Sequence, residues 1–393
     1  MSYKHTYITC FIGYITQAIS VNLLPLFFVI FQDDYQISFE KLGRLIFIFF
    51  VAQIVVDLIA VKYVDKIGYR PAAVAAHIFS TVGLIMLSIL PRVMPSPYMG
   101  IVIAVLTYSV GSGMIEVLIS PILNAVPSES KSGTMSLLHS FYCWGQLGTV
   151  LITTLILRII GTNLWYIIPI FWALIPLWNT FRFMRTPLVP PIPKEHRMSV
   201  KDLFKTKVFI IVLVLMTCSG AAEIAMSQWS SLFCERSLGV PKVIGDLLGP
   251  GLFALFMGIG RAVYGIFGHK LNLARILMVG SIICIACYLL AALSSIPILA
   301  LIGCALCGLS VSIMWPGVLS MSAEKFPNGG TALFGLCAVF GDLGAATGPW
   351  MTGLIADSAG LNVGLLVGIA FPVMMIGGVL IFRYLNTTGK TAV

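Results

Sequence analysis

The sequence predicts an all-α membrane protein with twelve transmembrane helices, arranged as two pseudo-symmetric six-helix bundles. The chain has 393 residues, of which 59% are hydrophobic and 10% are charged, whereas soluble domains average about 25% charged residues. Apolar runs of about 20 residues recur along the whole length, and each is long enough for a helix to cross a hydrocarbon core of about 30 Å. The runs are continuous rather than alternating in polarity, which disfavours membrane strands.

The twelve expected spans follow the apolar runs in order. The first run is too long for the core of a signal peptide and has no small-residue cleavage site, so we expect it to be retained. The predicted spans cover residues 6–31, 39–62, 71–91, 97–125, 134–160, 164–184, 207–234, 245–267, 275–294, 298–322, 331–356 and 362–385.

The net charge of +9 has a placement typical of membrane topology rather than of nucleic-acid binding. With both termini inside, all but six of the 24 Lys and Arg residues fall on cytoplasmic loops or cytoplasmic helix ends, which orients the protein. The six exceptions are Lys41, Arg44, Arg92, Arg158, Arg236 and Lys242. The short loops favour a bacterial inner membrane. We expect a monomer, with the lipid bilayer and no nucleic acid as partner.

Cysteine and histidine residues give no sign of a metal, a cofactor or a disulfide framework. The nine cysteines lie almost wholly inside spans, and we interpret the Cys304-x-x-Cys307 pair as small apolar core residues rather than a redox pair. An intramembrane enzyme would need a clustered catalytic or metal-binding set, so it is only a remote alternative. The five histidines lie in separate segments, at positions 5, 77, 139, 196 and 269.

A proline-rich, charged segment divides the chain into two halves. It reads "RTPLVPPIPKEHRMSVKDLFKTK" from 185 to 207, and proline together with charge keeps such a segment out of helix and in water. We therefore predict domains at 1–184 and 207–393, joined by a cytoplasmic linker at 185–206. Short matches suggest a parallel repeat: "GQLG" at 145–148 with "GDLG" at 341–344, and Asp57 at the position that corresponds to Arg261.

Glu116 is the most informative buried polar residue. It lies 11 residues before Pro127, where the fourth span should end, which places it about 16 Å deep at about 1.5 Å per residue. An ionised acid at that depth costs about 2.5–3.5 kcal/mol, a cost that usually accompanies function. A purely structural, protonated glutamate is the alternative. The stripe to which it belongs recurs at helical spacing and comprises Ser109, Ser112, Glu116, Ser120 and Asn124.

Two further acids lie near the middle of their spans. Glu223 in the seventh span and Asp342 in the eleventh are candidates, with Glu116, for proton coupling. An interdomain ion pair is an equally good interpretation of Asp342. A proline at membrane depth, Pro316 after Trp315, frees a backbone carbonyl, and such breaks often line sites, although a simple kink is the alternative.

Polar side chains that could bind a substrate occur in several spans. Gln17 and Asn22 in the first span are five residues apart, as are Glu223 and Gln228 in the seventh. Trp229 and Trp315 are candidate stacking faces, and for Trp229 simple packing is equally plausible. The substrate-binding candidates are Gln17, Asn22, Tyr142, Gln146, Gln228, Trp229 and Trp315.

The loop after the second span reads "VDKIGYRP" and resembles the signature loop of the major facilitator superfamily; the segment 260–268, which ends in "YGIFG", resembles its degenerate second copy. With twelve spans and a central linker, the resemblance covers the whole chain. It implies the major facilitator fold and alternating access around a cavity lined mainly by spans 1, 4, 7 and 10. Val61 replaces the first glycine of the loop pattern. The gating residues that the resemblance implies are Asp57, Asp65, Lys66, Gly68, Arg70 and Arg261.

Shorter motifs, "GSGMIE" (111–116), "GQLG" and the Glu223 to Trp229 segment, are similar to the fucose–galactose–proton symporter branch of that superfamily. That branch carries an acid in the first span, where this chain has Gln17 and Asn22. Because spans 1, 4, 7 and 10 contain no Arg or Lys in the candidate cavity, anionic substrates are disfavoured. We expect symport of a neutral monosaccharide or polyol with protons, or alternatively with sodium. A proton-coupled exporter of drugs or lipophilic cations is the rival function.

Overall fold

The computed structural model describes residues 3–37, 39–190, 198–236, 239–240, 244–245, 247–268 and 271–387. Within these ranges every regular element is a helix. Lys242, His196 and His269, which were named above, lie outside the described residues.

The predicted all-α fold with twelve spans is confirmed. Among the described residues, twelve helical segments are long and apolar enough to cross a membrane, and each overlaps one predicted span. They are Lys4–Phe27, Arg44–Val64, Tyr69–Val93, Pro97–Ala125, Lys131–Ile160, Ile167–Arg185, Lys207–Ser230, Leu247–Phe267, Leu273–Leu293, Pro297–Lys325, Gly330–Ala356 and Leu361–Leu385.

The first span ends earlier than the apolar run predicts. Helix α1 (Lys4–Asn22) gives way to a 3-10 turn, η1 (Leu24–Phe27), and a separate helix α2 (Phe28–Tyr35) follows. Pro25 lies in the turn. Proline has no N–H to donate to the preceding turn and its ring crowds that turn, so the α-helix is interrupted there.

The chain divides into two compact units, which we call unit 1 (Met1–Pro127 and Phe141–Pro191) and unit 2 (Ser128–Ser140 and Ile192–Val393). The predicted domain limits at 184 and 207 stay a prediction. Unit 1 contains α1 and α2, α3 (Phe39–Ile67), α4 (Tyr69–Val93), α5 (Pro97–Ala125), the larger part of α6 (Lys131–Ile160), η2 (Thr162–Leu164) and α7 (Ile167–Arg185).

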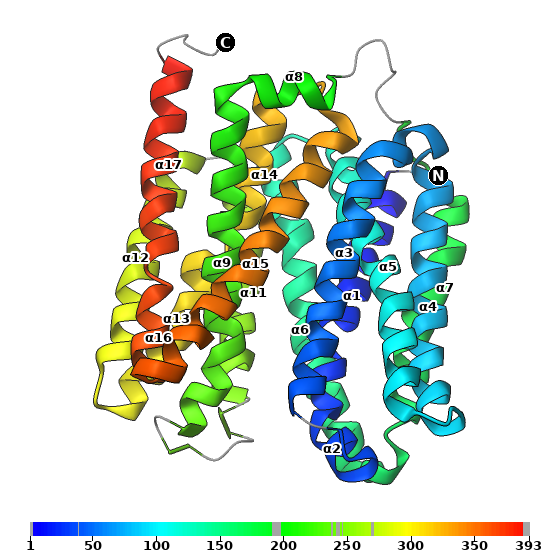
Figure 1. Cartoon of the computed structure of the whole chain (residues 1–393). Coiled ribbons are helices and arrows are strands. Elements are labelled where there is room, and N and C mark those ends of the chain that lie inside the picture. Colours follow the sequence, from blue (N-terminus) through cyan, green and yellow to red (C-terminus); the bar gives the residue numbers. More distant parts are fainter. Residues whose placement is uncertain are drawn as a thin grey trace. The chain divides into compact units, whose positions relative to one another are not determined.

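Helix α5 is the centre of unit 1 and packs against α1, α3 and α4 (Figure 1). The close approach of α3 depends on Gly113, because a Cβ atom at that position would lie only 3.1 Å from Asp57 Oδ1 and from Gln53 Cγ. At the far end from the α3–α4 loop, aromatic rings fill the core, with ring centroids 5.3 Å apart for Phe27 and Trp165. Polar residues of α5 are therefore enclosed by other helices.

In unit 2, helix α9 packs against α13, α14, α15 and α17. The helices of this unit are α8 (Val200–Lys205), α9 (Lys207–Arg236), the π-helical turn η4 (Leu247–Gly251), α11 (Leu252–Phe267), α12 (Leu273–Leu293), α13 (Pro297–Val311), α14 (Met314–Lys325), α15 (Gly330–Ala359), α16 (Leu361–Val367) and α17 (Ala370–Thr387). Residues 128–140, which include the beginning of α6, also belong to this unit.

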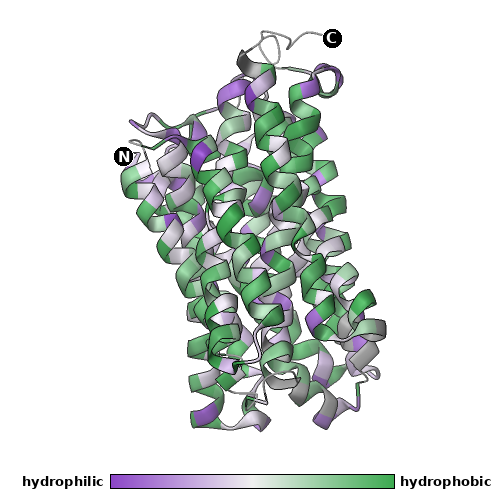
Figure 2. Ribbon diagram, turned by 90° about the vertical axis from the view of Figure 1, so that its left-hand side faces the viewer, coloured by the Kyte–Doolittle hydropathy of each residue, from purple (hydrophilic) through white to green (hydrophobic). Residues whose placement is uncertain are grey.

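The outer surfaces of the helices are apolar. Figure 2 shows hydrophobic residues along the length of the helices, with hydrophilic residues gathered mainly near the helix ends. Large side chains such as Phe47, Leu155 and Leu354 are exposed by 57–67%. In water this surface would be costly, whereas lipid tails solvate it.

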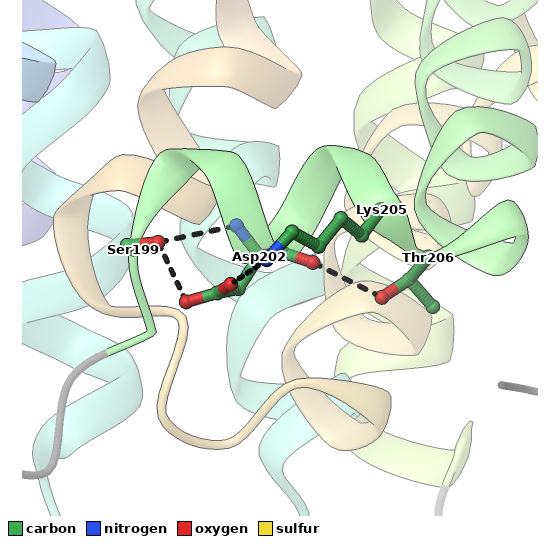
Figure 3. A network of polar contacts seen from close by, with 4 residues as sticks. All are labelled: Ser199, Asp202, Lys205 and Thr206. Carbon is green, nitrogen blue, oxygen red and sulfur yellow. Dashed lines mark hydrogen bonds and ion pairs between the residues drawn. The ribbon is translucent and has the colours of Figure 1, made fainter. Parts of the chain in front are cut away.

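A short helix precedes the first span of unit 2. Ser199 caps α8, since its Oγ accepts the N–H of Asp202 at 3.1 Å and donates to the Asp202 carboxylate at 2.6 Å (Figure 3). Lys205 Nζ lies 3.0 Å from the other carboxylate oxygen. These contacts fix the N-terminus of a helix of only six residues, whose first backbone N–H groups have no partner within the helix.

Candidate functional site

The Glu116 carboxylate lies inside unit 1, held by two amides. Its Oε2 accepts hydrogen bonds from Gln17 Nε2 of α1 at 2.7 Å and from Gln53 Nε2 of α3 at 2.5 Å. Glu116 is 9% exposed and the two glutamines are 5% and 2% exposed. The amides therefore replace the water that an exposed carboxylate would bind, which offsets part of the cost of burial.

Sequence reasoning missed Gln53. The available signal was the spacing of Gln53 and Asp57, two polar residues one helical turn apart in an otherwise apolar span. Asp57 is fully buried and lies on the face of α3 that meets Gly113 of α5. That face of α3 therefore points into unit 1, toward the polar stripe of α5.

Other predicted substrate-binding residues of unit 1 lie around the same helices. Asn22 Nδ2 donates to Ala18 O at 2.8 Å and lies 3.5 Å from the Tyr142 hydroxyl of α6. Gln146 follows Tyr142 by one turn and is buried. The structure therefore brings Asn22 of α1 close to Tyr142 of α6. Gln17 lies on the same helix as Asn22, and Gln146 lies on the same helix as Tyr142.

The hydroxyls of Tyr14 and Ser120 lie 2.9 Å apart and link α1 to α5 one turn beyond Glu116. Ser120 belongs to the polar stripe predicted on α5. The stripe thus faces other helices rather than lipid. Glu116 contacts two glutamine amides there, and Ser120 contacts the phenol hydroxyl of Tyr14.

In unit 2, Glu223 and Arg261 form a buried ion pair. Arg261 Nη2 lies 2.7 Å from Glu223 Oε2, and Arg261 is 2% exposed. Arg261 Nε donates to Ser312 O at 2.9 Å, and its Nη1 donates to His139 O at 3.4 Å. The sequence suggests coupling for Glu223 and gating for Arg261, and the structure joins the two side chains.

The carbonyl of Ser312 is available to Arg261 because of Pro316. In an α-helix the N–H of residue 316 would donate to the carbonyl of residue 312, and proline has no N–H to donate. The helix is interrupted between α13 and α14 at this point. At the break expected at Trp315 and Pro316, the guanidinium N–H of Arg261 therefore donates to Ser312 O in place of the missing backbone donor.

The aromatic and amide candidates of unit 2 have different surroundings. Trp229 Nε1 donates to Pro349 O of α15 at 3.0 Å, and its ring lies against Gly353. Trp315 lies against Gly341 of the same helix. These contacts tie α9 and α14 to α15. Gln228 is exposed, and Asp342 is buried on α15.

The predicted gating loop connects α3 to α4. Gly68 has φ of 91°, a conformation that favours glycine. Arg70 Nη1 donates to the carbonyls of Phe183 and Met184 at 2.9 and 2.7 Å, and a cation at a helix C-terminus is favourable. Lys66 is exposed, and the side chain of Asp65 is outside what the structure describes. In the described part of the chain, no group of three or more His, Cys, Asp or Glu could hold a metal ion.

The family model of the Major Facilitator Superfamily matches residues 10–333 and 251–392. The chain belongs to this superfamily. It is therefore a multi-pass membrane transporter, and the predicted resemblance at the level of the superfamily is confirmed. None of the curated proteins matches the chain by sequence.

Solved structures of major facilitator transporters share the fold over nearly the full length. The fucose:proton symporter of E. coli, in a single-residue variant, is 15% identical with a TM-score of 0.78, covering 97% of this chain and 99% of its own. A proton:xylose symporter is 11% identical with a TM-score of 0.80, covering 97% of this chain and 95% of its own. A human organic anion transporter is 14% identical with a TM-score of 0.76, covering 96% of this chain and 100% of its own. At these identities the likeness concerns the fold.

Proposed function

We propose that this transporter carries a neutral monosaccharide or polyol together with protons, by alternating access, with Glu116 as the residue that takes up the coupling proton. The observation that carries the proposal is the pair of amides on Glu116 Oε2. Protonation of the carboxyl group leaves no unpaired charge on an amide, as it would on a buried cation.

The two amides suit both protonation states of Glu116. An amide presents N–H donors on one side and a carbonyl acceptor on the other, so rotation about the last side-chain bond lets Gln17 or Gln53 bind either COO⁻ or COOH. Protonation removes the negative charge, and neutralisation lowers the cost of moving the carboxyl group into drier surroundings. That difference in cost can link proton binding to reorientation.

The chemistry of unit 1 favours a neutral, hydroxylated substrate. Gln17, Asn22, Tyr142 and Gln146 offer amides and a phenol, groups that both donate to and accept from hydroxyls. In unit 2, the guanidinium of Arg261 reaches the polar face of α9. Its positive charge is neutralised there by Glu223. Two of the solved structures of the same fold are proton symporters named for fucose and for xylose, which supports this class of substrate.

The topology completes the proposal. We place both termini in the cytoplasm, because Lys and Arg are concentrated on one set of loops. We also propose that the protein is a monomer in the inner membrane. The conformational change would use Asp65, Lys66, Gly68 and Arg70, at the junction of α3 and α4, as gating residues.

The test is uptake into proteoliposomes with an imposed pH gradient. A thermal-shift screen of neutral monosaccharides and polyols, beginning with fucose, galactose and xylose, selects the radiolabelled sugar. The wild type should accumulate it when the outside is acidic. Glu116→Gln should lose accumulation by at least about tenfold, a factor equivalent to about 1.4 kcal/mol, while it retains exchange of labelled for unlabelled sugar across the membrane.

Glu129→Gln is the matched control, because Glu129 is an exposed glutamate outside the predicted spans. It should behave as the wild type. Full accumulation by Glu116→Gln would eliminate Glu116 as the coupling residue, and a wild type that ignores the pH gradient with every sugar tested would eliminate proton symport.

A further inference from the structure

Asp57 of α3 lies against the part of α5 that carries Glu116, within unit 1. The position of a Cβ on Gly113 lies 3.1 Å from Asp57 Oδ1, and Gly113 precedes Glu116 by three residues, which puts the two on neighbouring parts of one helix face. Gln53, one turn before Asp57, donates to Glu116. Two independent contacts between α3 and α5 therefore bring the Asp57 and Glu116 carboxyl groups to the same level of the bundle.

Both groups are buried, Asp57 completely. It is costly to ionise two carboxyl groups that share a site of low polarity, so the pair binds one proton more tightly than a single carboxylate would. We propose that Asp57 and Glu116 form a two-carboxyl site that holds a single proton, and that Asp57 is thereby the second acid of the coupling step rather than a gating residue. This inference rests on the proposed function of Glu116.

A second observation concerns the neutral groups in the site. Within the described residues, Gln17 Oε1 and Ser112 Oγ are buried side-chain oxygens that have no hydrogen-bond partner. Gln17 Nε2 binds Glu116, so the amide carbonyl of Gln17 is part of the same site. Ser112 lies one turn before Glu116 on α5. An acceptor without a donor is costly when buried, and a carboxylic O–H on the pair would satisfy one.

The proton balance involves one O–H bond. When Glu116 is ionised, the glutamine N–H groups donate to Oε2, as in the structure. A hydronium ion then gives a proton to one carboxylate oxygen, which forms the new O–H bond and leaves a water molecule, and the charge of the pair changes from −2 to −1. The Gln17 amide rotates so that its carbonyl accepts the new O–H. Release of the proton to water reverses each of these changes.

Other titratable groups near the pair belong to the helices that pack on α3 and α5. Tyr14 and His77 are buried and hydrogen-bonded. Tyr14 is bonded to Ser120, and His77 is bonded to Asn179 and to the carbonyl of Ala73. Tyr108 of α5 is also buried. The nearby basic residues of α3 and α4, Arg44, Lys62, Lys66 and Arg70, are exposed.

Infrared spectroscopy of the purified, full-length protein tests the proposal without a substrate. The C=O stretch of protonated carboxyl groups is followed as the pH is raised, in the wild type, Asp57→Asn, Asp57→Glu, Glu116→Gln and the Asp57→Asn/Glu116→Gln double variant. Asp202→Asn, which removes an exposed carboxyl group on α8, is the matched control.

We expect one carboxyl band in the wild type that disappears as the proton leaves the pair. In Asp57→Asn and in Glu116→Gln the remaining acid has lost its like-charged neighbour, so the band should disappear at a lower pH, by about one unit or more, equivalent to about 1.4 kcal/mol. The double variant should lack the band. Asp57→Glu should retain the wild-type midpoint to within half of that shift, and Asp202→Asn should match the wild type.

If the pH at which the carboxyl band disappears is unchanged in Asp57→Asn, the two acids do not share a proton. Asp57 would then have a role in gating or packing. Loss of the wild-type band on addition of NaCl at constant pH also overturns the shared proton, and assigns the site to sodium. If Asp57→Asn does not fold, a midpoint in Glu116→Gln equal to that of the wild type has the same meaning. Failure of the sugar uptake assay with an intact infrared shift would refute the proposed function and leave the two-carboxyl site standing.

Discussion

The two buried glutamates, Glu116 in unit 1 and Glu223 in unit 2, lie in similar places in their spans but in different chemical surroundings. Glu116 is held by two neutral amides, whereas Glu223 is held by the guanidinium of Arg261. Protonation of a carboxylate beside a buried cation is costly, because it would leave the cation without a counter-charge. Depth in the membrane therefore does not by itself make an acid a proton carrier; the charge of the groups that it contacts also matters.

The comparison also separates the roles of the two units. In unit 2 the ion pair joins α9 to α11, and Arg261 extends to carbonyls of Ser312 and His139, so we interpret it as a structural link. In unit 1 the partners of Glu116 can each reverse donor and acceptor.

Removing one partner of the ion pair should have the largest effect on stability. Glu223→Gln leaves Arg261 buried and without its carboxylate, which should cost about 3–5 kcal/mol. Glu116→Gln keeps the shape and two neutral partners, so it should cost less than half as much. Denaturant unfolding of both purified variants in the same detergent measures the difference, and equal losses would remove the distinction between the two sites.

Removing both charges of the buried ion pair should cost less stability than removing one. Glu223→Gln together with Arg261→Gln removes both charges, so it should recover more than half of the stability lost in Glu223→Gln alone, since neutral replacement of a whole buried pair often costs little. If the double variant is less stable than either single variant, the pair is held mainly by the carbonyl contacts of Arg261 rather than by its charge.

Gln53→Leu should have an intermediate effect. It removes one donor to Glu116, and a hydrogen bond to a charged group contributes about 1.5–3 kcal/mol. The loss should be larger at high pH, where the carboxylate is ionised, than at low pH. Unfolding measured across pH checks this, with Gln228→Leu, which changes an exposed glutamine, as the control; a loss that does not depend on pH would contradict the role of Gln53 as a carboxylate partner.

Trp229→Phe should have a smaller effect, about 0.5–1.5 kcal/mol, because it removes only the hydrogen bond to Pro349 O while an aromatic ring remains. If Trp229 only packs, sugar binding measured by thermal shift should be unchanged. A loss of sugar-dependent stabilisation would instead support the stacking role that the sequence left open.

The smallest effect concerns the exposed ion pair on α8. The hydrogen bond from Ser199, followed by that from Lys205, lowers the pKa of Asp202 below its ordinary value of 3.8. A lowered pKa means that the contribution to stability is present above the ordinary value and is lost as the pH falls through the lower value. The protection of α8 from hydrogen exchange, relative to the intrinsic exchange rate at each pH, should therefore be unchanged from neutral pH to about pH 4 and should decrease below it. Asp202→Asn should abolish this pH dependence.

Much of the fold could be predicted because each span is a local property of about 20 residues. The polar stripe of α5 was visible for the same reason, since helical spacing placed Glu116 and Ser120 on one face. The partners were not visible, because Gln53 reaches Glu116, and Arg261 reaches Glu223, only after helices far apart in the sequence have packed. Trp229 shows the same limit: its sequence position suggested a binding surface, and its N–H is taken by Pro349.

The pairing of Pro316 with Arg261 has a consequence for how this protein can change over evolutionary time. An ordinary amino acid at 316 would restore a backbone donor for Ser312 O and compete with the guanidinium, while loss of Arg261 would leave that oxygen without its present donor. Each residue makes the other tolerable, and Arg261 also pairs with Glu223. We therefore expect replacements at 261 and 316 to succeed only when a neutral residue stands at 223 as well, a form of compensation that a random substitution library at 223, 261 and 316 would reveal.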